Sequence, residues 1–279
     1  MRPGRHRGWF RLLAFLVKPW LWALTKPDWR GMENIPREGG VIIVANHVTV
    51  LDPMTLAHAM YDGARRIPRF LAKVELFKVP VVGAALRKGG QIPVYRRTRE
   101  AANSLRDAEA AVAAGELVII YPEGTCTRDP NLWPMASKTG VARLALACDA
   151  PVIPVAHWGA HRILAYKSKR PSLFPRKKVQ AIAGRPVDLS AYRTRPTQGS
   201  GPTNETLREL TDLLMTEVKN LLGELRAEEP PAGFFAPAGS ATPSAGADPA
   251  AESGTDPAAE SGAESGADSA ADEAPTGAT

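Results

Sequence analysis

The sequence predicts one α/β domain, built on a mixed, largely parallel sheet that helices flank. Short runs rich in Val and Ile alternate along the chain with longer segments of helical periodicity, which is typical of buried strands joined by helices. The 226 residues that precede a low-complexity tail are enough for one sizeable core and too few for two. We therefore expect a single folded domain over residues 28–226, with a helical segment over 1–27 before it.

The elements follow in chain order. Runs of β-branched and apolar residues predict strands, and spacings of three and four predict helices. Gly115 ends one of these helices as a C-cap residue, and the last helix is amphipathic. The expected strands are Val41–Ala45, Arg69–Ala72, Gln91–Tyr95, Leu117–Tyr121, Val152–Val155 and Val179–Ala183, and the expected helices are Asp52–Tyr61, Arg99–Ala114, Lys138–Cys148 and Thr203–Arg226.

The C-terminal 53 residues, 227–279, have a different composition. They contain no Lys, Arg, Leu, Ile or Val and are rich in Ala, Gly, Ser, Pro and acidic residues. A segment of this composition buries too little apolar surface to offset its conformational entropy. We predict a disordered acidic tail.

The net charge of +6 conceals an asymmetry along the chain. The tail carries ten acidic residues, so the first 226 residues hold all 35 Lys and Arg against 19 acids, a net charge of +16. A body this basic favours anionic partners. The two cysteines, Cys126 and Cys148, are too few for a disulfide framework and indicate a reducing compartment.

The N-terminal segment indicates which anion is involved. Residues 1–27 are basic without an acid, and four of the six tryptophans lie within the first 29 residues. Arg11 and the Lys18-Pro19 pair interrupt the apolar run, which is unfavourable for a membrane-spanning helix of about 20 apolar residues. Tryptophan prefers the headgroup level, and basic flanks are attracted to anionic lipid. We predict a monotopic or peripheral segment at the cytoplasmic face of the cell membrane; packing of this helix on its own domain is the alternative.

Several common sites are missing from the sequence. There is no Gly-rich phosphate loop, no dinucleotide fingerprint and no nucleophile elbow. His157 and His161 have the spacing of helical zinc ligands, but they follow a strand without a third ligand, so a structural role is expected. We expect no metal and no cofactor.

The segment from Val41 to Pro53 carries the candidate chemistry. A buried strand ends at Asn46-His47, and Asp52 follows five positions after the histidine. On a regular helix the two side chains would lie roughly 140° apart, so they meet only if His47 precedes the helix. Asp52 would then fix the imidazole tautomer and leave the other nitrogen free to accept a proton from a hydroxyl.

Three later segments add to this pattern. Gly89–Arg97 ends a strand in Arg96 and Arg97, which suit a phosphate group. Tyr121–Asp129 leaves another strand through Pro-Glu-Gly, a sharp turn that exposes Glu123. Val152–Val155 is a buried strand that contains Pro154.

Together these four blocks resemble the glycerolipid acyltransferase family, which shows Asn-His-x4-Asp, Gly-x-Ile-Phe/Pro-x-x-Arg, Phe-Pro-Glu-Gly-Thr-Arg-Ser and a Val/Ile-Pro-Val strand in this order. The resemblance covers roughly Asp28 to Gly184, and it includes Lys138-Thr-Gly140, similar to the Lys-x-Gly that often follows the third block.

The resemblance implies the fold described above and a function. The family transfers an acyl group from a thioester to the free hydroxyl of 1-acyl-glycerol 3-phosphate, which makes phosphatidic acid for phospholipid synthesis, and uses no acyl-enzyme. By this resemblance His47 and Asp52 are the catalytic pair. The implied acceptor-binding residues are Arg96, Arg97, Glu123, Gly124, Thr125, Arg128 and Lys138.

One departure affects the third block. It reads Thr-Cys-Thr-Arg where the family has Thr-Arg-Ser, so Cys126 stands in place of the arginine and Arg128 is a candidate substitute.

The sequence leaves several alternatives open. They are acyl-CoA or acyl carrier protein as donor; another acceptor, namely glycerol 3-phosphate, another lysophospholipid or a glycolipid; and a non-catalytic lipid-binding module. A nucleic-acid binder is disfavoured because the tryptophans gather in one apolar segment.

Overall fold

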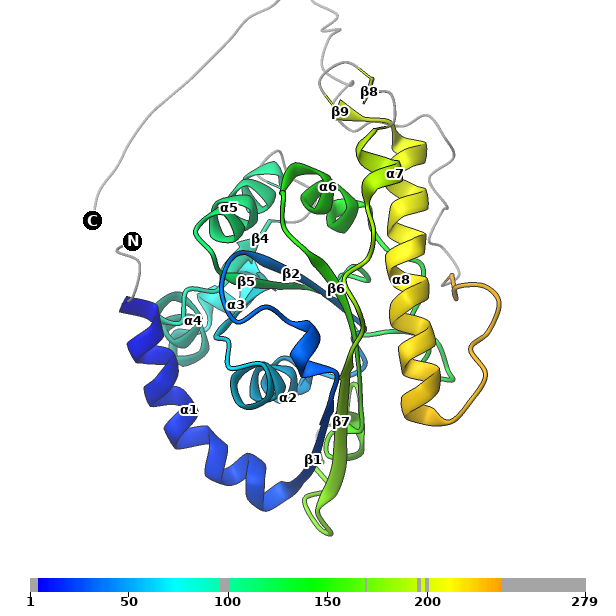
Figure 1. The fold of residues 1–279 in the computed structure, drawn as a ribbon. Helices are drawn as coiled ribbons and strands as arrows, with labels where there is room; N and C mark the ends of the chain where they lie inside the picture. The colour runs from blue at the N-terminus through cyan, green and yellow to red at the C-terminus, as the bar shows by residue number, and fades with distance from the viewer. Residues whose placement is uncertain (1–4, 96–100, 169, 195–196, 199–200, 237–279) are drawn as a thin grey trace, which may run out of the picture. The chain divides into compact units, whose positions relative to one another are not determined.

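The computed structural model describes residues 5–95, 101–168, 170–194, 197–198 and 201–236 (Figure 1). Within these residues, seven strands form one sheet in the order β1-β7-β6-β2-β5-β3-β4. Neighbouring strands run parallel except β6 and β7, which are antiparallel. The predicted α/β fold with a mixed, largely parallel sheet is confirmed.

The strands and helices alternate along most of the chain. The sheet contains β1 (Thr25–Arg30), β2 (Val41–Ala45), β3 (Pro68–Lys73), β4 (Ile92–Val94), β5 (Leu117–Ile120), β6 (Val152–Trp158) and β7 (Lys177–Ala183), and a separate short pair is formed by β8 (Thr197–Gln198) and β9 (Gly201–Pro202). The α-helices are α1 (Arg5–Leu24), α2 (Asp52–His58), α3 (Val74–Lys78), α4 (Pro80–Lys88), α5 (Ala101–Ala113), α6 (Gly140–Ala147), α7 (Ser190–Arg193) and α8 (Asn204–Arg226); single turns of other helix types are η1 (Met32–Asn34), η2 (Ala59–Gly63) and η3 (Ala160–Arg162).

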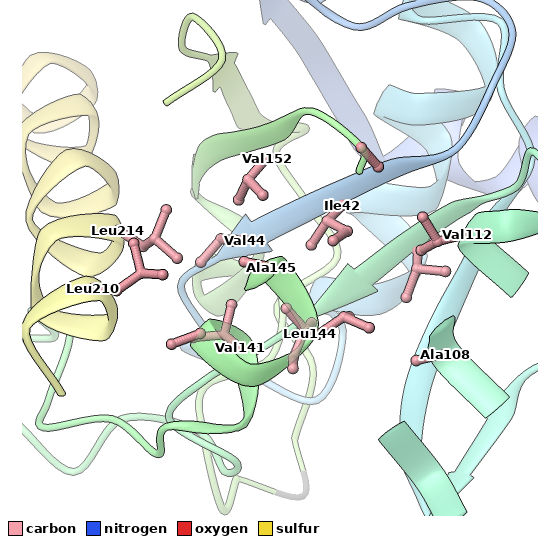
Figure 2. Close-up of a cluster of buried hydrophobic side chains, with 14 of the residues drawn as sticks. Ile42, Val44, Ala108, Val112, Val141, Leu144, Ala145, Val152, Leu210 and Leu214 are labelled. Carbon is pink, nitrogen blue, oxygen red and sulfur yellow. The ribbon is translucent and has the colours of Figure 1, made fainter. Parts of the chain in front are cut away.

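The central strands are buried on both faces, as parallel strands between helical layers must be. Every residue of β2, β5 and β6 is buried. Alternate side chains of β2 enter different clusters: Ile42 and Val44 pack with residues of α5, α6 and α8, and Val41 and Ile43 pack with residues of α2 and η2. Figure 2 shows Leu210 and Leu214 of α8 beside Val44 on the first of these faces.

Helix α8 covers that face because its apolar residues recur at spacings of three and four. Leu207, Leu210, Leu214 and Val218 are completely buried. The hydroxyl of Thr203 accepts a hydrogen bond from the N–H of Thr206 and caps the start of the helix. This is the amphipathic helix that the sequence predicts.

Two parts of the sheet region were not expected from the sequence. β1 is a polar edge strand that continues directly from α1 and pairs with β7. It crosses the expected boundary between residues 27 and 28. The α3–α4 pair fills the stretch between β3 and β4 with two short helices. Both segments lack the long apolar periodicity from which the other elements are predicted.

The expected start of the tail, at residue 227, also differs in the structure. Residues 227–236 pack back on the domain: the ammonium of Lys219 donates to the carbonyl of Pro231, and the carbonyl of Phe235 accepts a hydrogen bond from the N–H of Ala136. Backbone groups and one cation–π contact with Phe234 hold this segment, in place of the aliphatic side chains that it lacks. The remainder of the predicted tail, 237–279, lies outside the described residues.

Candidate active site

The site forms where two neighbouring parallel strands end. β2 and β5 pair with Val44 opposite Ile120, so their carboxyl ends meet at one edge of the sheet. His47 follows β2, and Tyr121 follows β5. The imidazole of His47 stacks on the ring of Tyr121, with 4.4 Å between ring centroids and an angle of 17° between planes. The stacking fixes the face of the imidazole.

The side chains of His47 and Asp52 meet across the turn that separates them. Asp52 is the first residue of α2 and His47 lies before the helix. The Nδ1 atom of His47 is 2.9 Å from Oδ2 of Asp52. Because a carboxylate only accepts, Nδ1 carries the proton and Nε2 presents a lone pair. The geometry is that of a general base with its orienting carboxylate.

Asp52 is held in its ionised form by its surroundings. Its carboxylate is 1% exposed, and Oδ2 also accepts the N–H groups of Val48 at 2.5 Å and Thr49 at 2.7 Å. Burial alone would raise the pKa of Asp52. The two neighbouring imidazoles and the N–H of Thr49 outweigh burial, so that the pKa lies below its ordinary value.

The second imidazole belongs to His157 on β6. Its Nδ1 lies 3.7 Å from Oδ1 of Asp52, the oxygen that does not face His47. Three hydrogen bonds tie His157 to Asn46: its Nε2 donates to the Asn46 carbonyl at 2.5 Å, its N–H donates to Oδ1 of Asn46, and its carbonyl accepts from the Asn46 amide. His157 therefore holds the end of β2 and lies beside the carboxylate. Sequence reasoning assigned His157 only a structural role.

The other ring nitrogen of His47, Nε2, faces Cys126. The Sγ atom of Cys126 lies 3.6 Å from Nε2 of His47. Burial, together with the charges of Asp52 and Glu123, raises the pKa of Cys126 to about 12, so it is a neutral thiol at physiological pH. The sequence indicated only that an arginine was missing here and gave no sign of this contact.

Glu123 lies in a different place from the one expected. Its side chain is buried, and its two oxygens accept the N–H groups of His47 at 2.9 Å and Met135 at 3.1 Å. Burial raises the pKa of Glu123 to about 8, against the opposing effect of these two donors. It thus joins the loop after β5 to the loop after β2 and positions His47, whereas the resemblance implied contact with the acceptor.

Comparisons with known proteins show what this chain is similar to. The family pattern named Acyltransferase matches residues 26–158. A 1-acyl-sn-glycerol-3-phosphate acyltransferase of Bacillus subtilis is 28% identical over 196 residues, which are 69% of this chain and 86% of that protein. The crystal structure of the 1-acyl-sn-glycerophosphate (LPA) acyltransferase PlsC from Thermotoga maritima superposes with a TM-score of 0.58 at 27% identity, over 83% of this chain and 86% of that one.

These comparisons support the glycerolipid acyltransferase family for this chain. An uncharacterised protein of Mycobacterium tuberculosis is 33% identical over 161 residues, and this match spans 54% of the present chain and 41% of that protein. The chain thus spans about two fifths of the length of its mycobacterial relative.

Around this site, cationic side chains come from the loop after β5 and from the end of β3. Arg128 and Lys138 are exposed on the loop after β5, and the N–H of Lys138 donates to the carbonyl of Pro122. Lys73, at the end of β3, is near enough to Cys126 to oppose the rise of its pKa. Lys73 is not among the site residues that the sequence predicts.

The remaining predicted site residues have different outcomes. Arg96 and Arg97 lie outside the described residues, directly after β4 and Tyr95. Gly124 and Thr125 lie in the turn after β5, where Gly124 has a φ of 69° that favours glycine, and its N–H donates to the Tyr121 carbonyl. Among the residues described, no group of three or more His, Cys, Asp or Glu side chains is arranged to hold a metal ion.

An apolar hollow of about 210 Å³ lies beside the start of α2. Leu51, which directly precedes Asp52, and Thr55, one helical turn after it, form part of the wall of this hollow. Side chains of α1 and of the β6–β7 loop complete it. Its lining, which exposes only apolar surface, comprises Val17, Trp20, Leu21, Leu24, Leu51, Met54, Thr55, Ile163, Leu164, Pro171 and Leu173.

Proposed function

We propose that this protein transfers a fatty acyl group from a thioester to the free hydroxyl of 1-acyl-glycerol 3-phosphate. The observation that carries the proposal is the 2.9 Å contact between His47 and Asp52, which leaves Nε2 as a proton acceptor at the edge of the sheet. Hydrolases that act through a nucleophile need an activated Ser or Cys, and the neutral thiol of Cys126 does not provide one.

The proposed reaction proceeds by direct attack. Nε2 of His47 takes the proton of the acceptor hydroxyl while the hydroxyl oxygen forms a bond to the carbonyl carbon of the thioester. The tetrahedral intermediate then expels the thiolate, which recovers the proton from the imidazolium. Asp52 stabilises the imidazolium throughout and keeps the ring in one tautomer. The products are a diacyl lipid and the free thiol.

Cys126 has a defined place in this scheme. At 3.6 Å its thiol is within reach of Nε2, and a neutral S–H is a weak donor. The acceptor hydroxyl, a stronger donor, takes this place when the substrate binds. The pKa of Cys126, about 12, argues against an acyl-cysteine intermediate, since the thiolate is the nucleophilic form.

The phosphate of the acceptor suits the cations around the site. Lys73 is the last residue of β3, and Arg128 and Lys138 lie on the loop between β5 and α6. We assign phosphate binding to these three residues together with Arg96 and Arg97. The same cations would accept glycerol 3-phosphate or another lysophospholipid, and either acyl-CoA or acyl carrier protein would serve as the donor.

We further propose that the enzyme works at an anionic membrane surface, on the cytoplasmic face. Helix α1 has four basic residues and no acidic one, and it exposes Phe15 and Trp20 at 76% and 71%. Among the described helices none is both long and apolar enough to cross a bilayer. The apolar hollow lies between α1 and the catalytic turn, where it suits carbon atoms of an acyl chain.

The test is a substrate panel with product identification. Purified full-length protein is incubated with lysophosphatidic acid, glycerol 3-phosphate and other lysophospholipids, each with acyl-CoA and with acyl carrier protein as donor, and the products are identified by mass. Formation of phosphatidic acid from lysophosphatidic acid, abolished in His47→Ala, is the expected result. A panel without any acylated product would refute the proposed activity.

A further inference from the structure

The large apolar side chains that remain exposed gather on a few segments. Within the described residues they come from α1, from the turn that leads into α2, from α3 and α4, and from the loop between β6 and β7. Helix α8 contributes none, although it is the longest helix described. The exposed residues are Leu12, Leu13, Phe15, Leu16, Trp20, Trp22, Val50, Met54, Leu76, Val79, Val81, Val82, Leu173 and Phe174.

The loop between β6 and β7, residues 159–176, contributes an unusual pair. Phe174 is 75% exposed and its neighbour Leu173 is 39% exposed. The loop is nevertheless well anchored. The N–H of Ser172 donates to the carbonyl of Ile163 at 2.7 Å, and the guanidinium of Arg176 donates twice to the carbonyl of Thr25. The chain on both sides of Phe174 is therefore held in place while the ring faces outward.

These anchors place the loop beside the end of α1. Thr25, which accepts from Arg176, directly follows the last residue of α1, and it is paired in register with Lys177 of β7. Figure 1 shows the end of α1 and the start of β7 at the same end of the sheet. Trp20 of α1 and Leu173 of the loop line the same apolar hollow. The aromatic residues of α1 and the loop thus belong to one surface.

The charge of the loop indicates which partner this surface fits. No Asp or Glu occurs between Asp149 and Asp188, a stretch that contains the whole loop. The loop and the first residues of β7 carry seven basic residues, of which Lys178 pairs with Asp28 of β1. The seven are Arg162, Lys167, Lys169, Arg170, Arg176, Lys177 and Lys178. Exposed aromatic residues among cations, without acids, are complementary to the anionic surface and the apolar interior of a bilayer.

We propose that the β6–β7 loop is a second membrane-inserting element, which enters an anionic bilayer through Phe174 alongside α1. The inference rests on the membrane association proposed above and adds a second site of contact to it. Two contacts at one end of the sheet hold the domain in one orientation on the membrane. A single interfacial helix would leave the domain free to rotate about the axis of that helix.

The test compares serine substitutions at two equally exposed phenylalanines, Phe174→Ser in the loop and Phe15→Ser in α1, in the full chain. Binding to vesicles of equal parts phosphatidylglycerol and phosphatidylcholine is measured by cosedimentation. Each substitution should weaken binding about tenfold, since each removes one aromatic ring that the bilayer would bury. Phe174→Trp is the matched control and should bind as tightly as the unmodified protein, because Trp suits the interface.

The outcomes separate the two levels of the proposal. Normal binding by Phe174→Ser, with weakened binding by Phe15→Ser, would remove the loop from the interface and leave α1 as the membrane contact. Failure of the unmodified protein to bind the vesicles would overturn both the insertion of the loop and the membrane association proposed for α1. A change from dimer to monomer in Phe174→Ser without any change in vesicle binding would assign the surface to a second copy of the chain. Unchanged activity on a short-chain soluble substrate shows that the variants are folded.

Discussion

The two long helices of the molecule, α1 and α8, are similar in length and differ in what covers their apolar residues. Helix α8 has 23 residues and buries Leu207, Leu210 and Leu214 completely. Helix α1 has 20 residues and, within its described side chains, none that is buried; Phe15 is 76% exposed. The apolar side chains of α8 stabilise the fold. On α1, Phe10 packs on Tyr61, whereas exposed side chains such as Phe15 are available to a partner outside the domain.

The polar residues of the two helices explain the difference. The outward face of α8 carries acids, among them Glu205, Glu209 and Asp212, that keep it in water. The charged residues of helix α1 are all basic. Apolar periodicity alone therefore does not separate a helix that packs on its own core from one that we propose to meet lipid; the sign of the accompanying charge is the further signal.

The largest expected effect lies at the site, apart from both helices. His47→Ala should lower kcat about 10²–10⁴-fold, because the general base is lost. The free energy of unfolding and vesicle binding should stay near those of the unmodified protein, since the side chain belongs to neither helix. Steady-state kinetics and urea unfolding measure these quantities. Near-normal turnover in folded His47→Ala would refute the base mechanism.

The next effect tests the contrast in burial directly. Leu214→Ala in α8 should lower the free energy of unfolding by about 2–5 kcal/mol, because it leaves a cavity in a completely buried site. Phe15→Ala in α1 should change it by about 0.5 kcal/mol or less, because the ring is exposed. Urea unfolding of both variants gives the comparison. Equal losses would mean that α1 is part of the core.

A deletion of residues 1–24 tests the role of α1 in membrane contact. It ends before Thr25, so β1 keeps its pairing with β7. The truncated protein should be released largely from anionic vesicles and lose activity on long-chain substrates. Deletion of residues 237–279 is the control and should leave binding unchanged, since anionic lipid repels this acidic segment. Binding of the full chain should weaken as salt rises. Full cosedimentation of the protein without α1 would contradict its assignment.

A smaller effect is expected from His157, which lies on the sheet between the two helical faces. His157→Gln can keep the donor to the Asn46 carbonyl and loses the group that faces Asp52. It should lower kcat about tenfold without a change in KM, because Asp52 is less well positioned. His157→Asn, whose amide nitrogen can replace Nδ1, should recover part of the loss. A normal kcat in folded His157→Gln would show that His157 serves only the fold.

The last prediction is a pH dependence of stability. Burial raises the pKa of Glu123 from 4.5 to about 8, so the folded state binds a proton that the unfolded state has released. The contribution of Glu123 to stability is present below about pH 4.5 and decreases as the pH rises toward 8. Urea unfolding at several pH values should show this slope, and Glu123→Gln should flatten it. An unchanged slope would assign it to other groups.

Much of the fold follows from local pattern. The buried strands Val41–Ala45 and Leu117–Ile120 and the helix Asn204–Arg226 correspond to apolar runs and spacings in the sequence. The edge strand β1 does not, because Thr25–Arg30 is polar and becomes a strand through its hydrogen bonds to β7. The composition of residues 227–236 predicts disorder. The structure orders them through contacts with residues such as Lys219, which the local composition does not reveal.

The sequence by itself determined the α/β class, the four ordered motifs and the spacing that lets Asp52 reach His47 through a turn. These features depend on neighbours in the chain. Only the tertiary structure decided the rest: that His157, 111 residues after Asn46, holds the end of β2; that Cys126 faces Nε2; and that Glu123 turns inward to the N–H of His47. The physical reason is that these contacts form between the ends of separate strands, and their partners are set by the order of strands in the sheet, which the separate local patterns do not specify.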